Sequence, residues 1–242
     1  MEQDFLSNID LFYTDEPVEE KEIIISGEEV HHIKDVLRYS VHDRIFVTDG
    51  KGNIYKSLIT EINKATMRCS IDEVWHYKNP FDNLTFCIPR LRTMDRLEFA
   101  LEKCVELGIT NFIIFDSIRT VIKGAKIERW EKVLLAAMKQ SLRAWLPKVQ
   151  YISSVSQIAA FPGKRVIFEQ SAVLPFNKFL SQPQISANKQ ENIYLVFGPE
   201  GGFADEEIAM TKKCSFVKLT DNRLRSETAI IAAASIISME LV

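Results

Sequence analysis

Residues 195–203 read LVFGPEGGF, an apolar run that passes directly into a glycine-rich loop. The whole chain has only 9 glycines in 242 residues, yet three of them fall between positions 198 and 202. Without a Cβ atom, a glycine backbone can turn tightly and approach a neighbouring group closely. Ligands of open α/β sheets bind beyond the carboxyl ends of strands. We therefore predict a buried strand over residues 193–197, followed by a ligand-binding loop rather than a plain connection.

The residues after the glycines restrict the kind of ligand. A phosphate-binding loop places Lys and Ser or Thr directly after its glycines, whereas here Phe203 and Ala204 are followed by Asp205, Glu206 and Glu207. Carboxylates in the first turn of a helix interact favourably with the helix dipole, but they would repel a bound anion. The loop is thus predicted to bind a neutral or cationic ligand.

A second loop, residues 219–228, reads LTDNRLRSET and leads into the apolar stretch 229–237. Because this stretch is apolar nearly all round, it predicts a helix that is buried or lies in a subunit interface. Capping of that helix by Ser226 or Thr228 is one explanation of the loop. A cap does not account for the charged side chains at the start of the helix, which are Arg223, Arg225 and Glu227.

Strands and helices alternate from residue 84 onward. Apolar runs predict strands over 84–88, 111–115, 166–168, 193–197 and 216–219. Helical spacing predicts helices over 94–107, 130–142, 206–214 and 227–241, and Gly108 is the expected C-cap of the first. The polar stretch 181–191 reads as a loop. This alternation predicts an α/β domain whose mostly parallel sheet is covered by helices on both faces.

The N-terminal part has a different pattern. Short β-like runs over 23–25, 44–48, 53–59 and 67–71 are separated by turn signals such as Asp49-Gly50, and they predict a small β-barrel. One helix is expected over 28–39, with Val30, Ile33, Val36 and Leu37 on its buried face. The pattern changes near Tyr77, so we expect two domains, residues 1–77 and 78–242.

Composition excludes several classes of protein. Hydrophobic residues make up 46% of the chain and charged residues 26%, which is ordinary for a globular protein with its own core. No apolar run approaches the roughly 20 residues of a membrane-spanning helix, and the N-terminus does not resemble a secretory signal. The four cysteines are scattered without metal-ligand spacing. We expect a cytoplasmic protein with no metal site and no membrane partner.

The formal net charge of −3 conceals an uneven distribution. Residues 1–89 carry 9 basic and 17 acidic side chains, whereas residues 90–148 carry 12 basic and 7 acidic ones, a net of +5. A basic segment within an acidic protein favours a polyanionic partner. The alternative for any single member is the solvated face of a helix.

Both C-terminal loops resemble one known family. LVFGPEGGF at 195–203, together with LRSETA at 224–229, is similar to the ribosomal RNA small subunit methyltransferase E family. HHIKDVLR at 31–38, KCVELGI at 103–109 and the stretch 129–141 also match, so the resemblance covers nearly the whole chain. It implies a SPOUT-class α/β domain with a C-terminal trefoil knot and a mostly parallel sheet, preceded by a PUA-like β-barrel that binds RNA.

The resemblance also implies an activity. Members methylate N3 of a uridine in 16S rRNA of the small ribosomal subunit, with S-adenosylmethionine as methyl donor and no metal, and they form homodimers through the C-terminal domain. Mapped position by position, donor binding falls on Phe197, Gly198, Glu200, Gly201, Gly202, Leu219, Leu224, Arg225, Glu227 and Thr228. Arg38, Arg119, Lys123 and Arg143 are the expected RNA contacts.

Methylation at N3 requires the N3–H proton to leave and the resulting imidate to be stabilised. Glu227 and Glu200 are candidates for the proton acceptor or for the partner of the sulfonium, and Arg225 is the candidate for stabilising the imidate. For Glu227, a role at the helix dipole is the competing explanation.

The chain departs from the family pattern at three positions. Thr220 and Asn222 stand where many members have Gly and Arg, and Ala204 replaces a Ser or Thr cap, for which Asp205 is the expected substitute. The first two departures keep open an alternative function, that of a non-catalytic RNA-binding factor in ribosome assembly.

Overall fold

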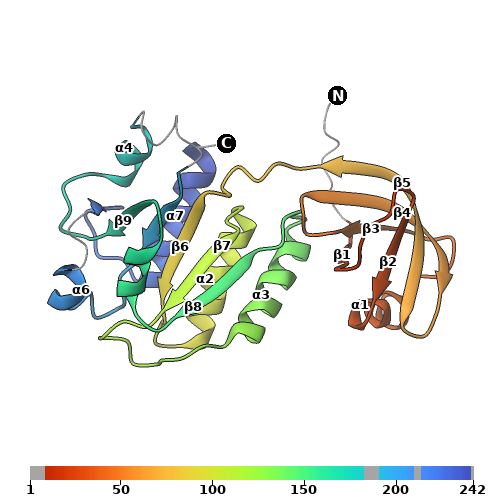
Figure 1. The fold of residues 1–242 in the computed structure, drawn as a ribbon, viewed down its shortest axis with the longest axis horizontal. Coiled ribbons are helices and arrows are strands. Elements are labelled where there is room, and N and C mark those ends of the chain that lie inside the picture. The colour runs from red at the N-terminus through yellow and green to blue at the C-terminus, as the bar shows by residue number, and fades with distance from the viewer. Residues whose placement is uncertain (1–8, 183–190, 210–213, 241–242) are drawn as a thin grey trace. The chain divides into compact units, whose positions relative to one another are not determined.

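The computed structural model describes residues 9–182, 191–209 and 214–240. Its internal contacts divide the chain into two compact units (Figure 1). The first unit consists of residues up to 79 together with 138–146, and the second of residues 80–137 and those from 147 onward. Neither unit is therefore one contiguous stretch of sequence.

The first unit contains one five-stranded sheet with the strand order β1-β3-β4-β5-β2. Its strands are β1 (Leu11–Tyr13), β2 (Glu22–Ser26), β3 (Arg44–Thr48), β4 (Asn53–Ile62) and β5 (Thr66–His76). Strand β1 pairs with β3 in parallel, and the other pairs are antiparallel. The four predicted strands are confirmed, as is the turn at Asp49-Gly50 between β3 and β4.

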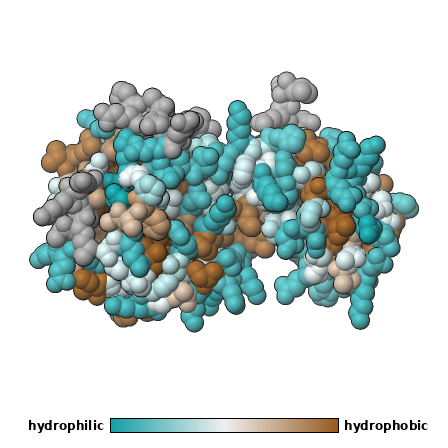
Figure 2. Space-filling model, viewed as in Figure 1, coloured by the Kyte–Doolittle hydropathy of each residue, from teal (hydrophilic) through white to brown (hydrophobic). Residues whose placement is uncertain are grey.

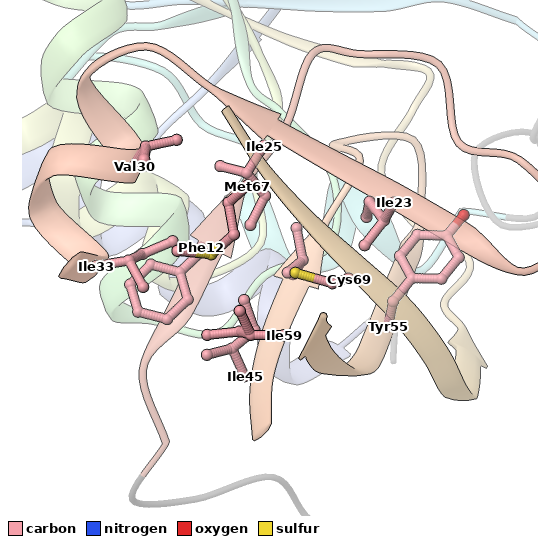
Figure 3. Close-up of a cluster of buried hydrophobic side chains, with 11 residues drawn as sticks. Phe12, Ile23, Ile25, Val30, Ile33, Ile45, Tyr55, Ile59, Met67 and Cys69 are labelled. Carbon is pink, nitrogen blue, oxygen red and sulfur yellow. The ribbon is translucent and has the colours of Figure 1, made fainter. Parts of the chain in front are cut away.

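Alternation along these strands builds the core of the first unit. Ile23 and Ile25 are fully buried and Ile24 between them is not, because successive side chains point to opposite faces of a sheet. Figure 3 shows Ile23, Ile25, Ile45 and Ile59 pointing toward a common interior with the Met67 thioether. The apolar positions thus fix which face of the sheet is inside.

The helix expected over 28–39 is shorter and changes type. Helix α1 (Glu28–His31) passes directly into the π-helical turn η1 (His32–Val36). Val30 and Ile33 are buried as predicted, but Val36 is 59% exposed and Leu37 38% exposed. The wider π turn advances each residue by a smaller angle than an α-helix does, so the last two side chains rotate off the buried face. Their predicted burial is wrong.

Residues 138–146 pack within the first unit. The Lys139 ammonium lies 2.7 Å from the Glu29 carboxylate, and the Trp145 indole N–H donates to the Tyr77 carbonyl at 2.9 Å. Gly52 has a φ of +98°, and a Cβ there would lie 2.6 Å from the Trp145 ring. These contacts explain why a segment distant in sequence belongs to this unit.

The second unit is built on a six-stranded sheet in which every pair is parallel, with the order β11-β9-β10-β6-β7-β8. Its strands are β6 (Leu84–Pro89), β7 (Asn111–Phe115), β8 (Lys148–Ile152), β9 (Lys164–Phe168), β10 (Ile193–Val196) and β11 (Ser215–Val217). The predicted parallel sheet is confirmed. Strand β8 was missed because, as an edge strand carrying Lys148 and Gln150, it lacks a continuous apolar run.

Helices cover this sheet. They are α2 (Met94–Glu106), α3 (Ile127–Gln140), the 3-10 helix η2 (Val155–Ala160), α4 (Phe176–Leu180), α6 (Asp205–Ala209) and α7 (Ser226–Glu240). Helices α2 and α7 pack side by side (Figure 1). Gly108, with a φ of +93°, follows α2 as predicted. Parts of the predicted loop 181–191 and of the predicted helices 206–214 and 227–241 lie outside the described residues.

Hydrophilic side chains cover much of the face drawn in Figure 2 in both units, with smaller apolar patches between them. Among the helices of the described residues, none combines the length and the hydropathy that crossing a bilayer requires.

Candidate active site

The two loops singled out in the sequence leave the same edge of the parallel sheet. Strands β10 and β11 both pair with β9, one on each side, so their carboxyl ends lie at one edge. Beyond that edge, residues 197–203, residues 217–226 and the end of β9 at 168–170 enclose a cavity of about 640 Å3. The cavity lies where ligands of parallel α/β sheets bind.

A hydrogen bond joins the two loops directly. The Ser226 hydroxyl, at the first residue of α7, donates to the Gly198 carbonyl at 3.0 Å. Ser226 is only 9% exposed. The residue considered as a helix cap therefore links the two segments that form the pocket.

The cavity wall combines aromatic, aliphatic and charged groups. Phe168 and Phe197 stack with ring centroids 4.5 Å apart and an interplanar angle of 3°. Val217, Leu219 and Leu224 add aliphatic surface. The polar lining residues are Glu169, Gln170, Glu200, Lys218, Thr220, Asn222, Arg223, Arg225 and Ser226. Such a wall can hold a ligand that has both an apolar ring and charged groups.

The glycines of the first loop are required for two different reasons. Gly202 has a φ of +70°, which side chains rarely adopt. At Gly201, a Cβ would lie 3.3 Å from the Arg119 Cβ, tighter than ordinary contact. The glycine-rich pattern predicts close approach to a ligand, but the close approach at Gly201 in the structure is to Arg119 of a neighbouring loop.

Eight of the ten predicted donor-binding residues line the cavity. These are Phe197, Gly198, Glu200, Gly201, Gly202, Leu219, Leu224 and Arg225. Glu227 and Thr228 are not among the lining residues. Ser226 and Ala229 of the same helix do line it, and since each helical residue turns by about 100°, the two positions between them face elsewhere.

Glu227 faces helix α2 instead. Its Oε1 lies 3.6 Å from the Arg96 Nε, and its Oε2 is buried without a hydrogen-bond partner among the described residues. Glu200, the other candidate carboxylate, lies in the cavity wall, where its Oε1 accepts a hydrogen bond from the Arg92 backbone N–H at 2.9 Å. The structure thus separates two carboxylates that the sequence could not distinguish.

Part of the pocket, at the end of β9, was not predicted from the sequence. Phe168, Glu169 and Gln170 line the cavity, and Ser226 joins its two loops. The sequence did indicate the position of Phe168, Glu169 and Gln170, because they fall at the carboxyl end of the predicted strand 166–168. In a parallel sheet that end lies at the same edge as the two loops. What was lacking was the strand order, which places β9 between β10 and β11.

The four predicted RNA contacts are all exposed, and they divide between the two units. Arg38 and Arg143 belong to the first unit, and Arg119 and Lys123 to the second. Arg90, which also belongs to the basic segment, is only 2% exposed, and its guanidinium lies over the Trp130 ring. Burial lowers the pKa of Arg90, and its position excludes it from a surface contact.

Residues 116–125 form the loop that carries Arg119 and Lys123, directly after β7. The Asp116 carboxylate closes the base of the loop by accepting from the Gly124 backbone N–H at 3.2 Å and from the Tyr151 hydroxyl at 2.6 Å. The Arg119 Nη1 donates to the Gly201 carbonyl at 2.9 Å. A basic loop therefore adjoins the glycine loop of the pocket.

Fold and site define a class: an α/β domain with a cavity at the carboxyl edge of a parallel sheet, accompanied by a small β unit. Two family models match the chain. The RNA methyltransferase domain matches residues 78–238, and the RNA methyltransferase PUA domain matches residues 25–72. The chain belongs to the RNA methyltransferase family.

Named relatives agree with this assignment. The chain is 30% identical over 232 residues to the Bacillus subtilis (strain 168) ribosomal RNA small subunit methyltransferase E, with 89% of each chain covered. The protein of the same name from Mesomycoplasma hyopneumoniae (strain 232) is 29% identical, with 88% of this chain and 92% of that protein covered.

Solved structures confirm the fold class. A probable rRNA-methyltransferase from Porphyromonas gingivalis superposes with a TM-score of 0.81 at 26% identity, covering 96% of this chain and 98% of the other. A ribosomal RNA small subunit methyltransferase E from Neisseria gonorrhoeae bound to S-adenosyl methionine gives 0.79 at 24% identity, with the same coverage. The predicted SPOUT-type α/β domain with a PUA-like β unit is confirmed.

Proposed function

We propose that this protein methylates N3 of a uridine in the 16S rRNA of the small ribosomal subunit, with S-adenosylmethionine as the methyl donor. The observation that carries the proposal is the cavity formed jointly by residues 197–203 and 217–226 in a chain of the RNA methyltransferase family. An enzyme with this substrate acts in the cytoplasm, where ribosomes are assembled.

The pocket fits the proposed donor. Ligand cavities of about 300–1,000 Å3 are typical for molecules of this size, and this one is about 640 Å3. The stacked rings of Phe168 and Phe197, with the aliphatic lining residues, provide an apolar wall for the adenine ring. Glu169 and Glu200 provide negative charge for a cationic sulfonium. The acidic first turn of α6 accords with the same preference for a cation over an anion.

S-adenosylmethionine supplies a methyl group on a positively charged sulfur that is itself a good leaving group. The protein must then hold uridine N3 in line with that methyl carbon, and orientation of this kind can lower a barrier by roughly 7–11 kcal/mol. The proposed proton acceptor for N3–H is Glu200, which lies in the cavity wall. The proposed group that stabilises the imidate is Arg225, which also lines the wall and is exposed.

Glu227 remains the competing candidate for the proton acceptor. The kcat values of the Glu200→Gln and Glu227→Gln variants distinguish the two candidates. Loss of a general base typically costs 10²- to 10⁴-fold in rate. We expect Glu200→Gln to lower kcat by about 10²-fold or more, and Glu227→Gln to lower it by less than about tenfold. The reverse order in a single-turnover assay would assign the proton acceptor to Glu227.

RNA binding is proposed to use the exposed cations of both units, Arg38, Arg119, Lys123 and Arg143. Each phosphate contact contributes about one to the slope of log affinity against log salt. Lys123→Ala should therefore weaken RNA binding and reduce that slope by about one. Lys178→Ala, which removes an exposed lysine of α4, is the matched control and should leave the slope unchanged.

A homodimer through the second unit is proposed from the apolar surface of α7 and α2. Ile231 and Ile236 of α7 are only partly buried, Met239 is 83% exposed, and Phe99 of α2 is 50% exposed. Exposed apolar surface of this kind marks interaction sites. Sedimentation should give twice the 27.8 kDa chain mass, and a monomer at micromolar concentration would contradict this part of the proposal.

The function is tested by mass spectrometry of rRNA nucleosides. A strain that lacks the protein should lose 3-methyluridine from 16S rRNA, and the purified protein with S-adenosylmethionine should restore it. Free 16S rRNA and assembled small subunits from that strain are offered separately, which identifies the form that is methylated. An unchanged nucleoside profile would reject the proposal, as would RNA binding without methyl transfer to either substrate.

A further inference from the structure

The buried carboxylate of Glu207 has a role that the proposed mechanism does not use. Glu207 is the third residue of α6 and only 5% exposed. Its Oε2 accepts from the Ala204 backbone N–H and from the Ser117 hydroxyl, both at 2.9 Å, and its Oε1 accepts from the Ile118 backbone N–H at 3.0 Å. A buried carboxylate requires partners of this kind.

Only the first of these bonds serves the helix. A Glu at the third position that bonds back to the N-cap N–H forms one half of a capping box, and Glu207 makes this bond to the Ala204 N–H. The other two bonds reach Ser117 and Ile118, some 90 positions earlier in the chain. They fix the loop 116–125 against the start of α6.

The same two segments meet at a second point. Arg119 donates to the Gly201 carbonyl at 2.9 Å, and its Cβ occupies the space that a side chain at Gly201 would need. Within the loop, the Ser117 backbone N–H donates to the Thr120 hydroxyl at 2.9 Å, and both residues are buried. The loop 116–125 and the loop 198–204 therefore form one connected structure.

We propose that Glu207 is a positioning residue that couples binding of the methyl donor to binding of RNA. The inference rests on the proposed function, in which residues 197–203 line the donor pocket while Arg119 and Lys123 contact RNA. A shift of the glycine loop on donor binding is then transmitted through Glu207 to the RNA-binding loop. Such coupling makes each ligand tighten the other, typically by 5- to 150-fold.

The test is a binding cycle with S-adenosylhomocysteine and 16S rRNA from the strain that lacks the protein. Kd for each probe is measured with and without the other. In the wild-type protein we expect each probe to tighten the other at least about fivefold. Glu207→Ala should bring this factor close to one. Glu206→Ala is the matched control, since that acid is exposed in the same helical turn, and it should retain the wild-type factor.

A conservative variant separates positioning from folding. The amide of Glu207→Gln can accept through one oxygen only, so either the Ile118 or the Ala204 N–H then faces an NH2 group. We expect this variant to retain the fold and to bind S-adenosylhomocysteine alone within about threefold of wild type, but to lose most of the coupling factor. A residue that served stability alone would change Tm and leave the coupling factor intact.

The outcomes are distinct. Coupling in the wild-type protein that persists in both Glu207→Ala and Glu207→Gln overturns the role of Glu207. Independent binding of the two probes to the wild-type protein overturns the coupling itself while leaving the proposed function standing. Failure of the wild-type protein to bind S-adenosylhomocysteine or RNA at all would contradict the proposed function instead.

Discussion

The two loops that form the pocket are held in very different ways. Residues 198–204 are fixed from outside: Ser226 bonds to Gly198, Arg119 to Gly201, and Glu200 to the Arg92 backbone. Residues 219–225 have fewer such ties: the Gln170 side-chain amide donates to the Asp221 carbonyl at 3.2 Å, and two further bonds are local. The Lys218 ammonium pairs with the Asp221 carboxylate at 2.6 Å, and the Asn222 N–H donates to the Thr220 hydroxyl at 3.3 Å.

We therefore expect the first loop mainly to determine the form of the pocket and the second loop mainly to supply side chains for the reaction. The first loop lines the cavity with three glycines and with Glu200, and its form is set by neighbours in the fold. The second loop presents exposed side chains, including Arg223 and Arg225, which are bound less firmly to the rest of the unit. Apart from Glu200, the proposed proton acceptor, substitutions in the first loop should therefore change stability and donor affinity together, whereas substitutions in the second should change the reaction and leave stability alone.

The largest effect is expected in the second loop, from Arg225→Ala. If Arg225 stabilises the imidate, its removal should lower kcat by about 10²- to 10³-fold, the range found for loss of one stabilising donor. Tm should stay unchanged because the side chain is exposed. Arg44→Ala, which removes an exposed arginine of the first unit, is the control and should retain full kcat. A kcat within about threefold of wild type would remove Arg225 from the mechanism.

Ser226→Ala should break the link between the loops. The Gly198 carbonyl loses its donor, and leaving such a group unpaired costs about 1–3 kcal/mol in the free energy of unfolding. Donor Kd should rise by roughly tenfold, as expected for a change of about 1.4 kcal/mol. Ser235→Ala removes a hydroxyl that bonds within α7 and should leave donor Kd unchanged. Equal donor binding in the two variants, measured by calorimetry, would show that the link is dispensable.

A smaller effect is expected from Gly202→Ala in the first loop. A residue with a side chain at a φ of +70° is strained by roughly 1–2 kcal/mol, and urea unfolding should show a loss of that size. Gly27→Ala, at a φ of +69° and a ψ of −140° in the first unit, should lose at least as much stability, because that backbone region is nearly restricted to glycine. Only Gly202→Ala should also weaken donor binding, because only Gly202 lies in the pocket. A donor affinity that falls equally in both variants would contradict the specific role of the first loop in the pocket.

The smallest effect is expected from Asp221→Asn. The hydrogen bond from Lys218 lowers the pKa of the Asp221 carboxyl below its ordinary 3.8. A lowered pKa in the folded state contributes stability above pH 3.8 that is lost as pH falls through the folded value. Because the pair is at the surface, Tm at pH 7 should be nearly unchanged. A large fall in Tm would mean that the second loop is held as firmly as the first.

Much of the fold was predictable because it depends on short-range patterns. The run at 195–197 followed by the loop GPEGG gave strand β10 and its loop, and the alternation at Ile23–Ile25 gave β2. Sequence patterns failed where the burial of a side chain, or the need for an apolar one, depends on the surrounding fold. The π turn η1 moved Val36 and Leu37 off the buried face, and the edge position of β8 removed the need for apolar residues.

The candidate site shows the same limit. Sequence placed Arg225 and Glu227 together at the start of one helix, but the orientation of α7 puts only Arg225 in the cavity wall. Glu207 was expected to act at the helix dipole, a local role. Its bonds to Ser117 and Ile118 depend on the strand order, which no pattern within either segment contains.

A crystal structure of the protein with S-adenosylhomocysteine tests the joint role of the two loops directly. We expect density for the ligand between residues 197–203 and 217–226, with the Ser226 hydroxyl still bonded to the Gly198 carbonyl. Density at any other place on the second unit, or a pocket whose two loops move apart when the ligand binds, would contradict the claim that these loops together form the methyl-donor site.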